Sequence, residues 1–273
     1  MLLQLQDIGG VKFMSNSYFE QEVFNNKKAF IPYIVAGYPS LDETKEYIFK
    51  MQEAGADMIE LGIPFSDPIA EGPISQYASG VAIENGANLE NIFNMVREIR
   101  EKSNIPLVFM AYANTIYKVG YDYFFKSCDE MNVRGVIIPD VPYEEKDEFD
   151  VYARKNNVDL ISFVPPSMED RIKKIAEKSR GFLYVISSIG KDIDNEEKIT
   201  DLEAITNLIK ETTITKTVIG FGIKTTDDAK EIIKHTDGIV VGSAIIKLID
   251  KDRQNAPNLI YDYVKQMKEA INS

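Results

Sequence analysis

The stretch ADMIELGIPFSDPIAEGP, residues 56–73, combines an apolar strand pattern with a loop that carries acidic residues. Its first half reads as a β-strand and contains one acid, Glu60, while the Pro- and Gly-rich second half holds Asp67 and Glu71. An ionised carboxylate in a buried strand is costly unless it is hydrogen-bonded or has a chemical task. A strand end followed by a stiff loop is typical of the functional edge of an α/β enzyme. The structural alternative is that Glu60 is a buried acid whose hydrogen bonds are satisfied and that the loop is a rigid turn.

The same pattern, an apolar run followed by a helix-like segment, recurs along the whole chain. The expected strands cover residues 30–35, 58–62, 107–110, 135–138, 160–163, 182–186, 218–219 and 238–241. The expected helices cover residues 18–25, 40–53, 89–102, 122–130, 144–156, 169–178, 202–210, 227–234 and 259–271, with a short one from Ala244. No low-complexity linker interrupts them, so we expect residues 1–273 to form one domain.

This alternation of strands and helices predicts the fold class. Continuous apolar strands separated by helices indicate a parallel sheet that is covered on both faces. Eight units in about 240 residues favour an α/β fold of the closed (β/α)₈ type, the TIM barrel. The extra N-terminal helix at residues 18–25 would cap the N-terminal end of the barrel. An open, doubly wound sheet is the alternative.

Composition excludes several classes of function. The chain has 273 residues and a net charge of -12, which argues against nucleic acid or an anionic membrane as a partner. One cysteine and one histidine cannot form a Cys/His zinc site or an internal disulfide, and we expect no metal. With no signal-peptide pattern and no long apolar run, we expect a cytoplasmic protein.

The loops after the last two expected strands predict an anion site. One reads Gly220-Phe221-Gly222-Ile223 and the other begins Gly242-Ser243 at a helix start. Glycines let backbone N–H groups approach an oxyanion, and a helix N-terminus adds the positive end of its dipole. In a (β/α)₈ barrel these two loops are the usual phosphate site. Tight turns without a ligand are the structural alternative.

Several of these segments together resemble the tryptophan synthase alpha chain family. The longest resembling motif is Glu60-Leu61-Gly62-Ile63-Pro64-Phe65-Ser66-Asp67-Pro68, and the others follow in order with similar spacing. They read Tyr112-Ala113-Asn114, Pro139-Asp140-Val141-Pro142, Gly220-Phe221-Gly222-Ile223 and Gly242-Ser243-Ala244-Ile245. The resemblance covers nearly the whole chain.

The resemblance implies a lyase that cleaves indole-3-glycerol phosphate, in a retro-aldol reaction, to indole and glyceraldehyde 3-phosphate. It implies no cofactor in this chain. It also implies a beta subunit as partner in an αββα heterotetramer, which receives the indole and carries pyridoxal phosphate. The predicted partner surface includes residues 64–67 and the loops after the third and fourth expected strands.

The resemblance also assigns roles to individual residues. Glu60 matches the general acid/base, and burial at a strand end would raise the pKa of its carboxyl towards neutrality. Glu71 matches the acid that hydrogen-bonds the indole N–H and stabilises positive charge on the ring. The remaining matches are an indole pocket of Tyr33, Met110, Tyr112, Ile137, Tyr184 and Phe221, and a phosphate site of Gly222, Gly242 and Ser243.

The sequence departs from the family pattern at two places. The second acid is usually aspartate, whereas Glu71 is one methylene longer. The loop after the sixth expected strand normally has a threonine, which braces that acid, followed by a glycine, which helps bind phosphate. Here that position reads Gly190-Lys191-Asp192-Ile193, so both are absent. These departures leave open a catalytically weak, alpha-like protein that binds and activates the beta subunit. A phosphate-binding barrel for another sugar phosphate is a third hypothesis, which the apolar pocket disfavours.

Overall fold

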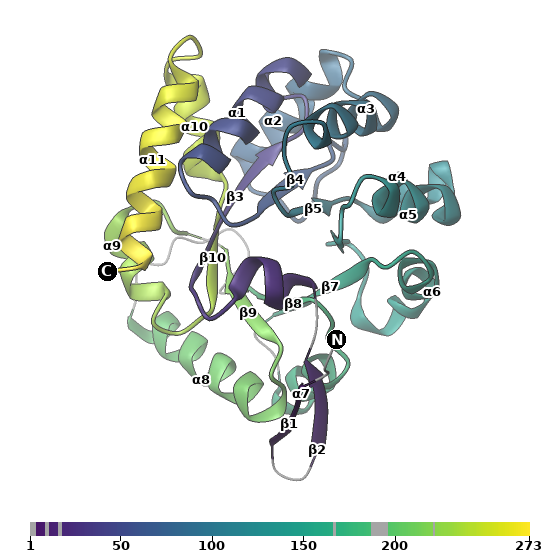
Figure 1. The fold of residues 1–273 in the computed structure, drawn as a ribbon, viewed down its shortest axis with the longest axis vertical. Helices are drawn as coiled ribbons and strands as arrows, with labels where there is room; N and C mark the ends of the chain where they lie inside the picture. The colour runs from purple at the N-terminus through teal and green to yellow at the C-terminus, as the bar shows by residue number, and fades with distance from the viewer. Residues whose placement is uncertain (1–3, 9–10, 16–17, 166–167, 187–195, 221) are drawn as a thin grey trace.

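A closed barrel of eight parallel strands forms the centre of the computed structural model (Figure 1). The structure describes residues 4–8, 11–15, 18–165, 168–186, 196–220 and 222–273. Around the barrel the strands follow one another in the order β3, β4, β5, β6, β7, β8, β9 and β10, and β10 pairs with β3. Their bounds are Ala29–Val35, Ile59–Gly62, Leu107–Met110, Gly135–Ile137, Asp159–Val164, Phe182–Val185, Lys216–Ile219 and Gly238–Val241. The predicted (β/α)₈ barrel is confirmed, and the alternative prediction of an open, doubly wound sheet is wrong.

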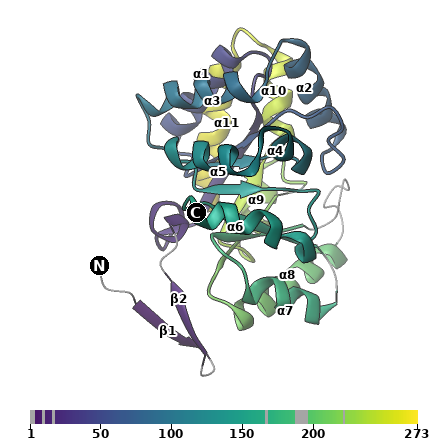
Figure 2. The same ribbon diagram turned by 90° about the vertical axis from the view of Figure 1, so that its right-hand side faces the viewer.

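Helices surround this barrel on its outer face (Figures 1 and 2). The helices α1 to α11 are Leu41–Glu53, Pro73–Glu84, Leu89–Arg100, Ala113–Val119, Tyr121–Glu130, Asp147–Lys155, Glu169–Glu177, Glu196–Thr212, Thr226–Ile232, Ser243–Lys251 and Ala256–Ile271, and a 3₁₀ turn, η2, covers Tyr143–Glu145. The predicted start of α1 is confirmed, because the Ser40 side chain accepts a hydrogen bond from the Glu43 N–H. None of the helices in the described ranges has the length and apolarity that crossing a membrane requires.

Helices α2 and α4 were not predicted from the sequence. The buried residues of α2 are Ser75, Ala78, Ser79 and Ala82, which repeat at helical spacing but are too small to give a strong apolar pattern. Pro73 occupies the first turn of α2. A proline is tolerated there because the N–H group that it lacks would have no partner within the helix. Small side chains on this face therefore allow a helix directly after the acidic loop.

The N-terminal segment contributes a helical turn and a hairpin. The expected leading helix is present as a π-helix, η1 (Glu20–Phe24), preceded by Phe19. The Phe19 ring lies 5.2 Å from the Phe182 ring and also contacts Gly135, so it closes the N-terminal ends of β8 and β6 as expected. Strands β1 (Gln4–Ile8) and β2 (Val11–Ser15) form an antiparallel hairpin that was not predicted and that extends away from the barrel (Figure 2).

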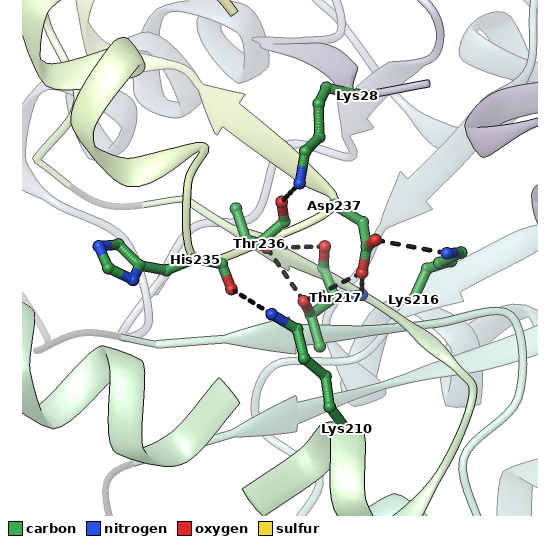
Figure 3. A network of polar contacts seen from close by, with 7 residues as sticks. All are labelled: Lys28, Lys210, Lys216, Thr217, His235, Thr236 and Asp237. Carbon is green, nitrogen blue, oxygen red and sulfur yellow. Dashed lines mark hydrogen bonds and ion pairs between the residues drawn. The ribbon is translucent and has the colours of Figure 1, made fainter. Parts of the chain in front are cut away.

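A polar network joins the N-terminal ends of β3, β9 and β10 (Figure 3). The Asp237 carboxylate accepts a hydrogen bond of 3.0 Å from the Thr217 N–H and pairs with Lys216 at 3.4 Å. The Thr236 hydroxyl donates to the Thr217 carbonyl at 2.8 Å, and Lys28 Nζ donates to the Thr236 carbonyl at 2.5 Å. Polar groups at this end of a barrel serve stability, while the opposite end carries the chemistry.

Replacing Asp237 by alanine should lower the free energy of unfolding by about 1–3 kcal/mol, because the buried N–H and hydroxyl of Thr217 lose an acceptor. Urea denaturation followed by circular dichroism measures the change. The exposed, mid-helix Asp262→Ala variant is the matched control and should stay within about 0.5 kcal/mol. A loss of stability no larger than that of the control would contradict the assigned role of the network.

Candidate active site

Glu60 lies on β4 with its side chain on the same face of the sheet as Tyr33 of β3 and Val108 of β5, which flank it in register. The residue is only 3% exposed. No hydrogen bond to its carboxyl is present among the described residues. Burial, and secondly the charge of Glu71, raise the pKa of Glu60 to about 8. The carboxyl is therefore mostly protonated at neutral pH.

Glu71 lies in the loop between β4 and α2 and is held by two tyrosines. The Tyr33 hydroxyl donates to Glu71 Oε2 at 2.5 Å, and the Tyr112 hydroxyl donates to Oε1 at 3.4 Å. Tyr112 in turn accepts a hydrogen bond from the Ala70 N–H at 3.2 Å. Burial raises the pKa of Glu71, while the two hydroxyl donors oppose that rise by stabilising the carboxylate. Each carboxylate oxygen of Glu71 thus accepts a hydrogen bond, and the two bonds fix the side chain.

The two acids occupy one site but have different surroundings. Among the described residues Glu60 has no hydrogen-bond donor, whereas Glu71 has two, so the first carboxyl is the one that keeps its proton. The negative charge of Glu71 is the second cause of the raised pKa of Glu60, so it favours the protonated form of the first acid. An unequal pair of this kind can supply one proton donor and one fixed negative charge at neutral pH.

Three glycines make room for the tyrosines of this site. A Cβ atom at Gly62 would lie 2.5 Å from the Tyr33 hydroxyl oxygen, and one at Gly242 would lie 2.6 Å from Tyr33 Cδ1. A Cβ at Gly220 would collide with the Tyr184 hydroxyl, which donates to the Gly220 carbonyl at 3.3 Å. The roles of Gly62 and Gly220 were not predicted, although a glycine at the end of an apolar strand is a signal for close approach.

The structure brings together most of the predicted indole pocket. Met110 and Ile137 are register partners on β5 and β6, and Met110 also pairs with Gly62. The Tyr112 ring stacks on Phe65 at 4.9 Å, and the charge of Glu60 raises the pKa of Tyr184, after the larger effect of burial. Predicted residue Phe221 lies outside the described residues, as do Asp192 and Ile193 of the atypical loop. That these side chains bind indole stays a prediction.

The predicted phosphate residues meet the backbone requirements for an anion site. Gly222 has φ = +77°, in the region that favours glycine, and follows β9. Gly242 is the N-cap of α10, and Ser243 is the exposed first residue of that helix. The first N–H groups of a helix have no partner within it and can bind an anion. Phosphate binding at this position stays a prediction.

The described residues contain no group of three or more His, Cys, Asp or Glu side chains that could hold a metal ion. The single cysteine, Cys128, is buried on α5, where burial raises the pKa of its thiol. Glu60, Glu71 and the tyrosines in contact with Glu71 are titratable groups of the described site.

Comparisons with known proteins identify the family of this chain. The family model described as tryptophan synthase alpha chain matches residues 19–272. The chain is 40% identical over 252 residues to the tryptophan synthase alpha chain of Lacticaseibacillus casei, covering 92% of this chain and 95% of that one. It is 42% identical over 250 residues to that of Alkaliphilus metalliredigens, covering 90% and 94%.

Solved structures give the same result. Tryptophan synthase subunit alpha from Legionella pneumophila has a TM-score of 0.83 at 32% identity, with coverage of 91% of this chain and 94% of that one. Tryptophan synthase subunit alpha from Campylobacter jejuni has a TM-score of 0.82 at 28% identity, with coverage of 91% and 98%.

Glu60→Gln should raise the free energy of unfolding at pH 7 relative to the unsubstituted protein. Since the folded pKa of Glu60 is raised to about 8, its contribution to stability is fully present below the unfolded value of about 4.5 and is lost as the pH rises towards 8. The stability difference should therefore grow by about 3 kcal/mol between pH 4.5 and pH 7, at about 1.4 kcal/mol per pH unit. Urea denaturation across this range measures it, and a difference that does not change with pH would refute the raised pKa.

Proposed function

Because the chain belongs to the tryptophan synthase alpha chain family, we propose that Glu60 and Glu71 together perform its lyase reaction. The reaction cleaves indole-3-glycerol phosphate to indole and glyceraldehyde 3-phosphate. The observation that carries the proposal is the unequal pair of acids, in which Glu60 keeps its proton and Glu71 is held by Tyr33 and Tyr112.

Glu60 acts first as acid and then as base. Its carboxyl protonates indole C3, and the ring takes up the positive charge. The resulting Glu60 carboxylate then removes the proton from the hydroxyl on the adjacent carbon of the side chain. The carbon–carbon bond breaks, its electron pair returns to the ring, and the products are indole and the aldehyde. Glu60 ends the cycle protonated, as it began, which a pKa of about 8 permits near neutral pH.

Glu71 stabilises the charged ring through a hydrogen bond from the indole N–H. A carboxylate fixed before the substrate arrives needs little reorganisation when charge develops. Tyr33 and Tyr112 fix it here, and they are positioning residues for Glu71 as well as members of the proposed indole pocket. We propose that this pair of hydroxyls accommodates the extra methylene of Glu71.

The remaining parts of the site have binding roles in the proposal. Met110, Ile137, Tyr184 and Phe221 hold the indole ring, and Gly222, Gly242 and Ser243 hold the phosphate. The chain itself uses no cofactor. A beta subunit that carries pyridoxal phosphate binds the same end of the barrel, in an αββα assembly located in the cytoplasm, and receives the indole directly. The support for the partner is membership of the family.

Glu60→Gln should reduce indole release by about 10²–10⁴-fold, because an amide cannot transfer the proton. For the unsubstituted chain, kcat/KM should fall as the pH rises through about 8, since Glu60 must start protonated. Indole release from indole-3-glycerol phosphate is measured with and without a beta subunit, and Glu46→Gln, an exposed acid on α1, is the control.

Unchanged turnover in Glu60→Gln would remove Glu60 from the mechanism. Absence of turnover in the unsubstituted chain, together with stimulation of the beta subunit, would favour the regulatory hypothesis. Absence of both effects would favour a phosphate-binding barrel with another substrate.

Removing the Tyr33–Glu71 hydrogen bond from either side should lower kcat/KM. Glu71→Asp withdraws the carboxylate by one methylene, and a misplacement of about 1 Å costs on the order of a hundredfold in rate. Tyr33→Phe keeps Glu71 but removes a donor that lowers its pKa, so the acid limb of the pH profile should move to higher pH. Tyr117→Phe, which is 71% exposed, is the control. A rate increase in Glu71→Asp would mean that Glu71 impairs the enzyme.

A further inference from the structure

A cavity of about 320 Å³ lies between the C-terminal ends of β6 and β7, the following segment up to Lys146, and helix α7. Its lining includes part of the motif Pro139-Asp140-Val141-Pro142 but none of the residues proposed above for catalysis, for the indole pocket or for phosphate binding. The volume is at the lower end of the range for sites of small organic molecules. The proposed reaction gives this cavity no role.

Lys146 places a buried positive charge on the wall of the cavity. Its Nζ donates to the Leu160 carbonyl and to Ser162 Oγ, both at 2.8 Å and both neutral acceptors. Within the described part of the chain no carboxylate forms an ion pair with it. Burial lowers the pKa of Lys146 to about 8, so the amine is still largely protonated at neutral pH. A buried ammonium group without a counter-ion is costly, and one of its three N–H donors is left for a ligand.

The more distant charges around Lys146 oppose one another. Asp150 and Asp159 raise its pKa, whereas Arg180 and Arg154 lower it. Arg180 is itself paired with Asp159 at 2.7 Å. The charges around Lys146 therefore partly cancel, and none of these carboxylates neutralises its ammonium group.

Tyr143 also lines the cavity. Its hydroxyl is buried and has no hydrogen-bond partner among the described residues. An unpaired buried hydroxyl costs free energy, so a polar ligand that reaches it would be stabilised.

The other charged groups that line the cavity already have partners. Arg171 forms two hydrogen bonds with the Glu144 carboxylate, at 2.7 and 3.0 Å. Asp140 accepts from the Ala113 N–H at 3.0 Å. Among the described residues of the lining, Lys146 is thus the cation without an ion pair, and Tyr143 carries the unpaired buried hydroxyl.

We propose that this cavity binds a small monocarboxylic acid with an apolar body. The carboxylate accepts hydrogen bonds from Lys146 and Tyr143, and the body packs against Ile138, Ile175 and Ile186. A phosphate ester fits less well, because the described lining offers a dianion a single cation without an ion pair, Lys146. The proposal goes beyond the lyase function and does not depend on it.

Benzoate is the probe, and the ¹³C-labelled methyl groups of isoleucine report where it binds. Benzoate should shift the signals of Ile138, Ile175 and Ile186 in a saturable manner, and neutral benzamide should bind at least tenfold more weakly. Lys146→Met should weaken benzoate binding at least tenfold, and Tyr143→Phe should weaken it severalfold. Lys155→Met, at a side chain that is 70% exposed, is the control and should leave the affinity unchanged.

The affinity of the unsubstituted chain for benzoate should also fall as the pH rises above about 8, where Lys146 loses its proton. This measurement and the benzamide comparison need no substitution, so they test the proposal even if Lys146→Met fails to fold. Equal binding of benzoate and benzamide, full affinity in a folded Lys146→Met variant, or shifts confined to isoleucines outside the cavity would overturn it. Indole release is measured separately, so failure here leaves the lyase proposal intact.

Discussion

The buried carboxyl of Glu60 is the constraint on which the rest of the site depends. A carboxylate without a hydrogen-bond donor inside an apolar barrel is unstable, and the protein responds by keeping the proton on the acid. The same burial that would destabilise the charged form gives the acid a pKa near the pH at which it works. Stability and catalysis therefore make opposite demands on this one position. Burial of the many apolar side chains of the core stabilises the fold and offsets the cost of burying Glu60.

The sequence predicted the barrel because its strands are continuous apolar runs, and each of the eight was found within a few residues. It predicted less where side chains are small or signals are short. The buried face of α2 consists of serines and alanines, so it lacks the large apolar residues at helical spacing from which a helix is predicted. The hairpin of β1 and β2 was missed although Gly9 and Gly10 separate the strands, a two-residue pattern typical of a hairpin turn.

The sequence predicted which residues belong to the site, but not which of them contact one another. Glu60 and Glu71 could be assigned because both lie within residues 56–73 and the family resemblance supplied their roles. The bond between Tyr33 and Glu71 joins residues 38 positions apart, and it depends on the register of β3 with β4 and on the path of the loop. No local pattern contains that information. Lys146 was equally hidden, because it occurs in a run of charges that reads as an exposed helix face.

The glycines around Tyr33 connect these levels. Gly62 ends the strand that carries Glu60, and Gly242 begins the helix proposed to bind phosphate, yet both are also in contact with the Tyr33 ring. A side chain at either position would displace the ring and with it the hydroxyl that holds Glu71. The proposed acid pair and the proposed phosphate site are therefore connected through one tyrosine. Gly242 therefore has two reasons to be a glycine. The proposed phosphate site needs its backbone to be accessible, and the Tyr33 ring, whose hydroxyl holds Glu71, needs the space that a Cβ atom would fill.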